Sequence, residues 1–141
     1  MHLETGLAFL LLLAHRIDAF TFGQPRQQPS VAIAVIGANG KTGRKSVAVA
    51  LKKNAPVIAI TTSGTFNTEG LDLPAKATAK SLQNVVGNVQ DLAGLTASLK
   101  GCKAAIFAAS ASKTGGTPQQ VDRDGLVNVA KACIANKVRI S

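Results

Sequence analysis

The sequence predicts an α/β fold, in which a parallel β-sheet carries helices on both of its faces. Three strand-length apolar runs, at residues 31–36, 57–61 and 104–109, are rich in β-branched and small side chains, as expected of strands covered on both sides. Stretches with apolar residues at helical spacing separate these runs, and this alternation favours parallel pairing through right-handed crossovers. The 141 residues, 46% of them hydrophobic, suffice for one domain and exclude a disordered chain.

The first 30 residues differ in composition from this domain. Residues 7–14 form an aliphatic run that is too short to cross about 30 Å of hydrocarbon but matches the core of a secretory signal. We expect residues 1–20 to be a signal peptide, residues 21–30 a short transit-like linker, and residues 31–141 the folded domain. In this interpretation no stable membrane anchor remains once the signal is removed.

The junction Ile17-Asp18-Ala19-Phe20 resembles the Ala-Phe site at which algae with secondary plastids separate the signal from a plastid transit peptide. The resemblance implies import into a plastid through the secretory route. Two alternatives stay open. An ordinary secretory signal would send the protein to the endoplasmic reticulum or out of the cell, and a gene-model artefact would leave it in the cytoplasm.

A βαβ unit opens the folded domain. The strand at 31–36 ends at Gly37, and a glycine-containing turn leads into an amphipathic helix that must end before Pro56. The strand at 57–61 follows. A strand that returns after one helix favours a parallel neighbour.

The middle of the domain is less distinct. Residues 62–73 are polar and carry no clear signal, whereas 75–82 and 84–86 predict a short helix and a third strand. Asp91 then supplies an N-cap side chain for a helix that ends at Gly101.

The last elements predict an incomplete sheet. A helix that opens near Pro118 follows the strand at 104–109, and a final strand begins at 138–141, where the sequence ends. We expect about four to five strands. The truncated sheet would expose a hydrophobic edge, and we expect a protein partner to cover it.

The chemistry of the chain is predicted to lie in Gly37-Ala38-Asn39-Gly40-Lys41-Thr42-Gly43, between the first strand and its helix. Glycines let the backbone turn sharply and approach a ligand closely, and the helix points its positive end at the same place. This combination favours a bound phosphate. The glycines occupy the first, fourth and seventh positions, one residue longer than the usual dinucleotide fingerprint.

Two other interpretations of the same segment are open. Gly40-Lys41-Thr42 matches the end of a P-loop, but that motif requires a glycine at position 35, where the chain has Val35. A glycine turn that binds no ligand is the second alternative. The strand-turn-helix context favours dinucleotide binding over both.

Together with Arg44, this segment resembles the Gly-Ala-Thr-Gly-x-Thr-Gly-Arg loop of the atypical short-chain dehydrogenase/reductase family, including its NmrA-like members. Residues 86–91 and the helix containing Val121, Asp122 and Gly125 are similar to two further family patterns. Members of the family bind NAD(P), so the resemblance implies a Rossmann-like sheet. Asn39 and Asn88 depart from the usual threonine and aspartate.

The resemblance also implies three groups of cofactor-binding residues. The first would hold the pyrophosphate, the second would lie near the adenine, and the third would line the nicotinamide side. These groups are Gly37, Ala38, Asn39, Gly40, Lys41, Thr42, Gly43 and Arg44; then Asn88 and Val89; then Ala108, Ala109 and Ser110.

The end of the second strand indicates which cofactor is bound. NAD recognition generally uses an acidic residue about 20 residues beyond the first glycine, whereas NADP needs room and positive charge for its 2′-phosphate. The chain has Thr61, Thr62 and Ser63 there, and no acid. Thr62 and Ser63 can donate to a phosphate, with charge from Arg44 or Lys41. We therefore expect NADP, with NAD as the alternative.

The charge balance agrees with an anionic ligand. The chain has 16 Lys and Arg residues against 7 Asp and Glu, a formal charge of +9, which suits a dinucleotide. It has no Trp and no Tyr, and so lacks the aromatic platforms on which single-stranded bases commonly stack. We do not expect a nucleic-acid partner.

No catalytic or metal-binding residue can be assigned. The family's reductases use a serine and a Tyr-x-x-x-Lys pair, but this chain has no tyrosine. Cys102 and Cys133 are expected to be buried thiols. Two functions remain: an NADP-dependent oxidoreductase, or a fragment of one, with an unknown small-molecule substrate, and a non-catalytic NAD(P)-sensing or scaffold protein of NmrA-like type.

Overall fold

The computed structural model describes residues 32–111 and 116–141. The predicted signal peptide and linker, and Val31 at the start of the first predicted strand, lie outside the described residues. The elements are β1 (Ile33–Ile36), α2 (Lys41–Lys52), β2 (Val57–Thr61), α3 (Ala75–Ser81), β3 (Leu82–Val86), α4 (Leu92–Ser98), β4 (Ala104–Phe107), the π-helical segment η1 (Gln119–Asp124), α6 (Gly125–Asn136) and β5 (Arg139–Ile140).

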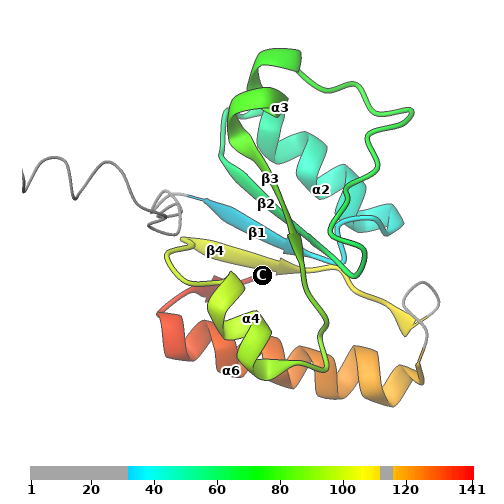
Figure 1. The fold of residues 1–141 in the computed structure, drawn as a ribbon, viewed down its shortest axis with the longest axis vertical. Coiled ribbons are helices and arrows are strands. Elements are labelled where there is room, and N and C mark those ends of the chain that lie inside the picture. The colour runs from blue at the N-terminus through cyan, green and yellow to red at the C-terminus, as the bar shows by residue number, and fades with distance from the viewer. Residues whose placement is uncertain (1–31, 112–115) are drawn as a thin grey trace, which may run out of the picture.

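The strands form one parallel sheet in the order β3-β2-β1-β4-β5. β1 is central, and its residue Val35 lies in register with Ala59 of β2 and Ile106 of β4. Helices α2 and α3 cover one face, whereas α4 and α6 cover the other (Figure 1). The predicted Rossmann-like class, with an incomplete parallel sheet of about five strands, is confirmed.

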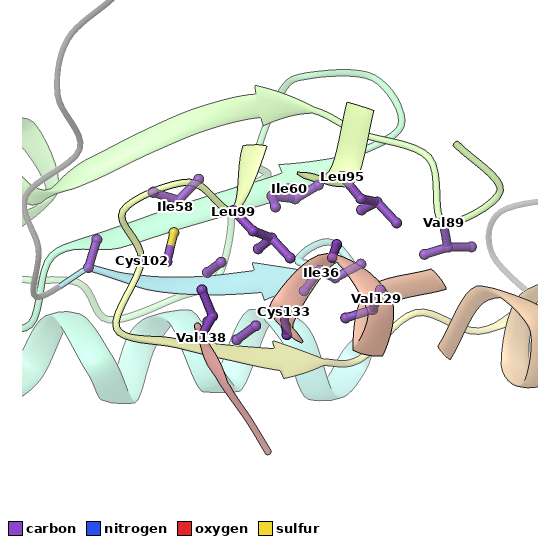
Figure 2. Close-up of a cluster of buried hydrophobic side chains, with 14 of the residues drawn as sticks. Ile36, Ile58, Ile60, Val89, Leu95, Leu99, Cys102, Val129, Cys133 and Val138 are labelled. Atoms are coloured by element: carbon purple, nitrogen blue, oxygen red, sulfur yellow. The ribbon is translucent and has the colours of Figure 1, made fainter. Parts of the chain in front are cut away.

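Side chains of successive strand residues alternate between two apolar layers. On β1, Ala34 and Ile36 pack towards α4 and α6, whereas Val35 packs towards α2. The layer under α4 and α6 contains Leu95, Leu99 and several residues of α6 (Figure 2). Because both faces of β1 and β2 are covered, these strands are apolar except for Thr61 at the end of β2.

The helix boundaries follow local chemistry. The Asp91 side chain accepts a hydrogen bond of 3.1 Å from the backbone N–H of Gly94, as the predicted N-cap requires. The helix predicted from Pro118 begins with the π-helical segment η1. Thr117 and Gln120 cap this start reciprocally, each side chain accepting from the other's backbone N–H.

Four strands differ from their predicted extents. β1 begins at Ile33 rather than at residue 31, and β3 begins at Leu82 rather than at residue 84. β4 ends at Phe107 rather than at residue 109, because its partner β1 ends at Ile36, which lies in register with Phe107. β5 contains only Arg139 and Ile140, and both are exposed. Within the described residues no helix has the length and apolar character needed to cross a membrane.

Both cysteines are buried thiols, as predicted. Cys102 and Cys133 belong to the apolar layer under α4 and α6, and neither is in a disulfide. Burial, with a smaller contribution from the nearby Cys133, raises the pKa of Cys102 from 9.0 to about 11. Burial also raises the pKa of Cys133.

These thiols should react slowly with a disulfide reagent at pH 8 in the folded protein, and fully once guanidinium unfolds it. The contribution of Cys102 to the free energy of unfolding should be fully present below pH 9 and be lost between pH 9 and about 11, because its thiol ionises at a lower pH in the unfolded chain. Urea titrations at several pH values measure this loss. Cys102→Ala should reduce it, and an equal fall in that variant would contradict the assignment to Cys102.

Candidate functional site

Two adjoining clefts lie at the carboxyl edge of the sheet, where ligands of open α/β sheets bind. Both are lined by Gly37, Thr61, Thr62 and Ala109. The first cleft extends towards β3, and the second extends along the glycine loop to the end of β4. The first adds Ile36, Ile60, Gly87, Asn88, Val89, Gln90 and Val121, and the second adds Asn39, Gly40, Ala108 and Ser110.

Backbone hydrogen bonds fix the glycine loop between the two clefts. The N–H groups of Gly37 and Ala38 donate to the carbonyl of Ile60 on β2, at 3.0 and 3.2 Å. Gly40 then donates to the carbonyl of Gly37 and closes the turn. α2 starts directly afterwards without a side-chain cap. Its first-turn N–H groups therefore lack intrahelical partners and form a positive end suited to an anion.

The three glycines of the loop differ in how strictly a side chain is excluded. Gly37 has a φ of +75°, and a Cβ there would lie 2.5 Å from the Cα of Ala109. A Cβ on Gly43 would lie 2.8 Å from the Cα of Ala38. At Gly40 the nearest atoms, two carbonyl oxygens, are 3.3 and 3.4 Å away. Gly37 and Gly43 thus maintain the fold. A Cβ on Gly40 would fit only tightly against these two oxygens, so the glycine there chiefly lets a ligand approach the helix start.

The β3 side of the first cleft is a polar turn. The side-chain oxygen of Asn88 accepts from the backbone N–H of Gln90 at 2.9 Å and leaves the Nδ2 group as a donor for a ligand. Gly87 donates to the carbonyl of Thr61 at 2.9 Å. Val89, which is buried, is anchored through its carbonyl by Asn128 at 3.0 Å.

Nine of the fifteen residues predicted for cofactor binding line the two clefts. They come from four separate segments of the chain. They are Gly37, Asn39, Gly40, Thr62, Asn88, Val89, Ala108, Ala109 and Ser110.

The other six predicted residues line neither cleft. Ala38 and Gly43 are buried beneath the glycine loop, and Lys41 and Thr42 line a different hollow beside α2. Ser63 donates to the carbonyl of Thr65 at 3.3 Å.

The sixth, Arg44, uses its guanidinium within the protein. Its Nε donates to the carbonyl of Asn67 at 3.2 Å, and Nη2 donates to the carbonyl of Glu69. Arg44 therefore holds the segment after β2 in place, while its remaining N–H groups are still available as donors.

Sequence reasoning did not assign six of the residues that line the clefts. Ile36, Ile60 and Thr61 end β1 and β2, so their position at the carboxyl edge could have indicated them. Gly87 and Gln90 belong to the family-like segment 86–91. Val121 comes from η1, and it lines the first cleft together with Ala109 of the predicted set.

A further hollow, of about 570 Å³, lies along α2. Its lining includes Ile33 of β1, Ile106 of β4 and the lysines Lys41, Lys45 and Lys53. The described residues contain no cluster of metal-ligating side chains.

Comparison with known proteins agrees with this geometry. The sequence model of a family described as NAD(P)H-binding matches residues 37–140. No curated protein matches the sequence.

Several solved structures share the fold. The Bordetella bronchiseptica enzyme WbmH in complex with NAD+ is 21% identical, with a TM-score of 0.59 over 76% of this chain and 36% of that one. Vestitone reductase from alfalfa is 18% identical, with a TM-score of 0.61 over 77% and 33%. The NADPH complex of quinone oxidoreductase QOR2 from Escherichia coli is 26% identical, with a TM-score of 0.52 over 77% and 35%.

The chain thus spans about a third of the length of these three structures. Because the sequence model matches from the first glycine of the loop to the last strand, the chain belongs to the NAD(P)H-binding family.

Proposed function

We propose that this chain binds NADP at the carboxyl edge of its sheet, with the pyrophosphate at the glycine loop. The observation that carries the proposal is the uncapped start of α2, which faces a turn where Gly37 and Gly40 add no side chains. A diphosphate can approach such a turn closely enough to accept from several backbone N–H groups. The residues present therefore fit a dinucleotide.

The two clefts indicate where the adenine and the nicotinamide of the cofactor would lie. The adenine would occupy the first cleft, where the Asn88 amide can donate to a base edge and Val89 supplies an apolar wall. The nicotinamide would extend into the second cleft, past Ala108 and Ser110. A bound nicotinamide ring would supply hydride-transfer chemistry, and the residues of the second cleft would orient it.

The preference for NADP rests on the end of β2. Thr61, Thr62 and Ser63 follow one another there without an acidic side chain, so nothing repels a 2′-phosphate. Helix α2 contributes Lys41, Arg44 and other basic residues and no acid. The similar structures do not decide this point, since one holds NAD+ and another holds NADPH.

As the biochemical role we propose the cofactor-binding part of an NADP-dependent oxidoreductase of the atypical short-chain type. The second candidate is a non-catalytic, cofactor-sensing or scaffold protein. A protein partner would cover the open edge at β5, where Arg139 and Ile140 are exposed. We also propose that residues 1–30 direct the protein to a plastid.

A titration of NADPH fluorescence tests the cofactor site. Gly40→Val should raise the Kd about tenfold or more, because a branched side chain at the helix start blocks the pyrophosphate. The new Cβ lies 3.3 Å from the nearest atom, a backbone oxygen that must shift slightly, so the circular dichroism of the variant is compared with that of the wild type to check the fold. Ala93→Val, an equivalent enlargement at an exposed position of α4, serves as the control. Equal binding by the wild type and Gly40→Val would refute the loop's role.

A fluorescent-protein fusion carrying residues 1–30 tests the proposed destination in an alga with secondary plastids. The fusion should accumulate in the plastid. Phe20→Ala should hold it in the endoplasmic reticulum or send it out of the cell, because the Ala-Phe junction would be lost. Secretion of the unaltered fusion would support the ordinary signal instead, and cytoplasmic fluorescence would support the artefact.

A further inference from the structure

A single side chain fastens the glycine loop to the segment that follows β2. The Nδ2 group of Asn39 donates to the carbonyl of Thr65, and its Oδ1 accepts from the backbone N–H of Asn67, both at 2.8 Å. Both ends of one amide are therefore used, on main-chain groups 26 and 28 residues away. We call residues 65–67 the latched segment.

The latched segment is also held by a buried side chain and by α2. Phe66, between the two partners of Asn39, is only 5% exposed and packs in the apolar layer under α2. Arg44 adds a hydrogen bond to the carbonyl of Asn67. The main chain on either side of a buried ring is thus fixed by the glycine loop and by α2.

The carbonyl of Thr65 receives more donors than it can satisfy well. Besides Asn39 at 2.8 Å, the hydroxyls of Thr61 and Ser63 each lie 3.3 Å from this oxygen. A carbonyl oxygen has two lone pairs, and the two hydroxyl contacts are long for an O–H donor. Asn39 therefore makes the short bond, and the hydroxyls are held weakly.

This arrangement leaves a hydroxyl ready for a ligand. Ser63 is exposed, whereas Thr61 is buried, so the Ser63 hydroxyl hydrogen is the one that can turn outwards, while the Ser63 oxygen keeps accepting from the backbone N–H of Thr65 at 3.3 Å. When it does, the Thr65 carbonyl stays satisfied by Asn39. Ser63 then donates to an incoming anion without leaving a carbonyl unpaired, which would otherwise cost binding energy.

We propose that Asn39 is a positioning residue for the 2′-phosphate of NADP, which acts by releasing the Ser63 hydroxyl. The inference rests on the proposed NADP site. Asn39 acts through Ser63 and the latched segment, and distinguishes a cofactor with a 2′-phosphate from one without. Threonine, the usual family residue at this position, has one short hydroxyl and cannot reach both partners.

The experiment measures the Kd of the full chain for NADPH and for NADH, which differ only in the 2′-phosphate. Asn39→Thr should raise the Kd for NADPH about tenfold and that for NADH less than twofold, as expected for the loss of a hydrogen bond to a charged group. Ser63→Ala should do the same. The double variant should show no further loss, because both changes remove the same donor. Asn84→Thr, at an exposed position of β3, is the matched control.

The outcomes separate this inference from the proposed function. Suppose that the wild type prefers NADPH and that Asn39→Thr weakens the binding of both cofactors equally, or of neither. Asn39 then has no role in cofactor selection, and this inference fails while the proposed NADP site stands. Additive losses in the double variant would refute the route through Ser63. A wild type that binds neither cofactor, or prefers NADH, overturns the proposed NADP site and this inference with it.

Discussion

The close approach of two stretches of main chain determines the rest of the site. After β1 the chain turns at Gly37, where a Cβ would lie 2.5 Å from the Cα of Ala109. The turn is also bonded to the carbonyl of Ile60. The ends of β1, β2 and β4 therefore meet at one point, and the uncapped start of α2 faces it. Without a glycine here, the clefts and the helix start would separate.

The sequence was sufficient to predict the elements whose signals are local. The apolar runs of β1 and β2, and Asp91 as an N-cap, depend on neighbouring residues, and the structure has all three. The extent of β4 could not be predicted, because its end depends on where β1 stops. The π-helical start of the helix after Pro118 had no recognisable sequence signal.

The segment after β2 shows why part of the site could not be predicted. Residues 62–73 have no periodicity, and their order comes from distant partners: Phe66 in the core, and Asn39 and Arg44 on its main chain. The type and position of Arg44 indicated a cofactor contact, whereas the structure shows its guanidinium on two carbonyls. Such tertiary contacts cannot be read from spacing alone, even where the glycine loop itself can.

The two apolar layers differ in how far apart in the sequence their residues lie. The buried members of the layer under α2 all lie between Val35 and Phe66, whereas the layer under α4 and α6 joins Ala32 to Val138. Contacts between residues near in sequence close smaller loops and form sooner. We expect the glycine loop to acquire its shape during synthesis, before α6 has left the ribosome. Pulse-labelled hydrogen exchange during refolding would then show protection of α2 and β2 ahead of α6.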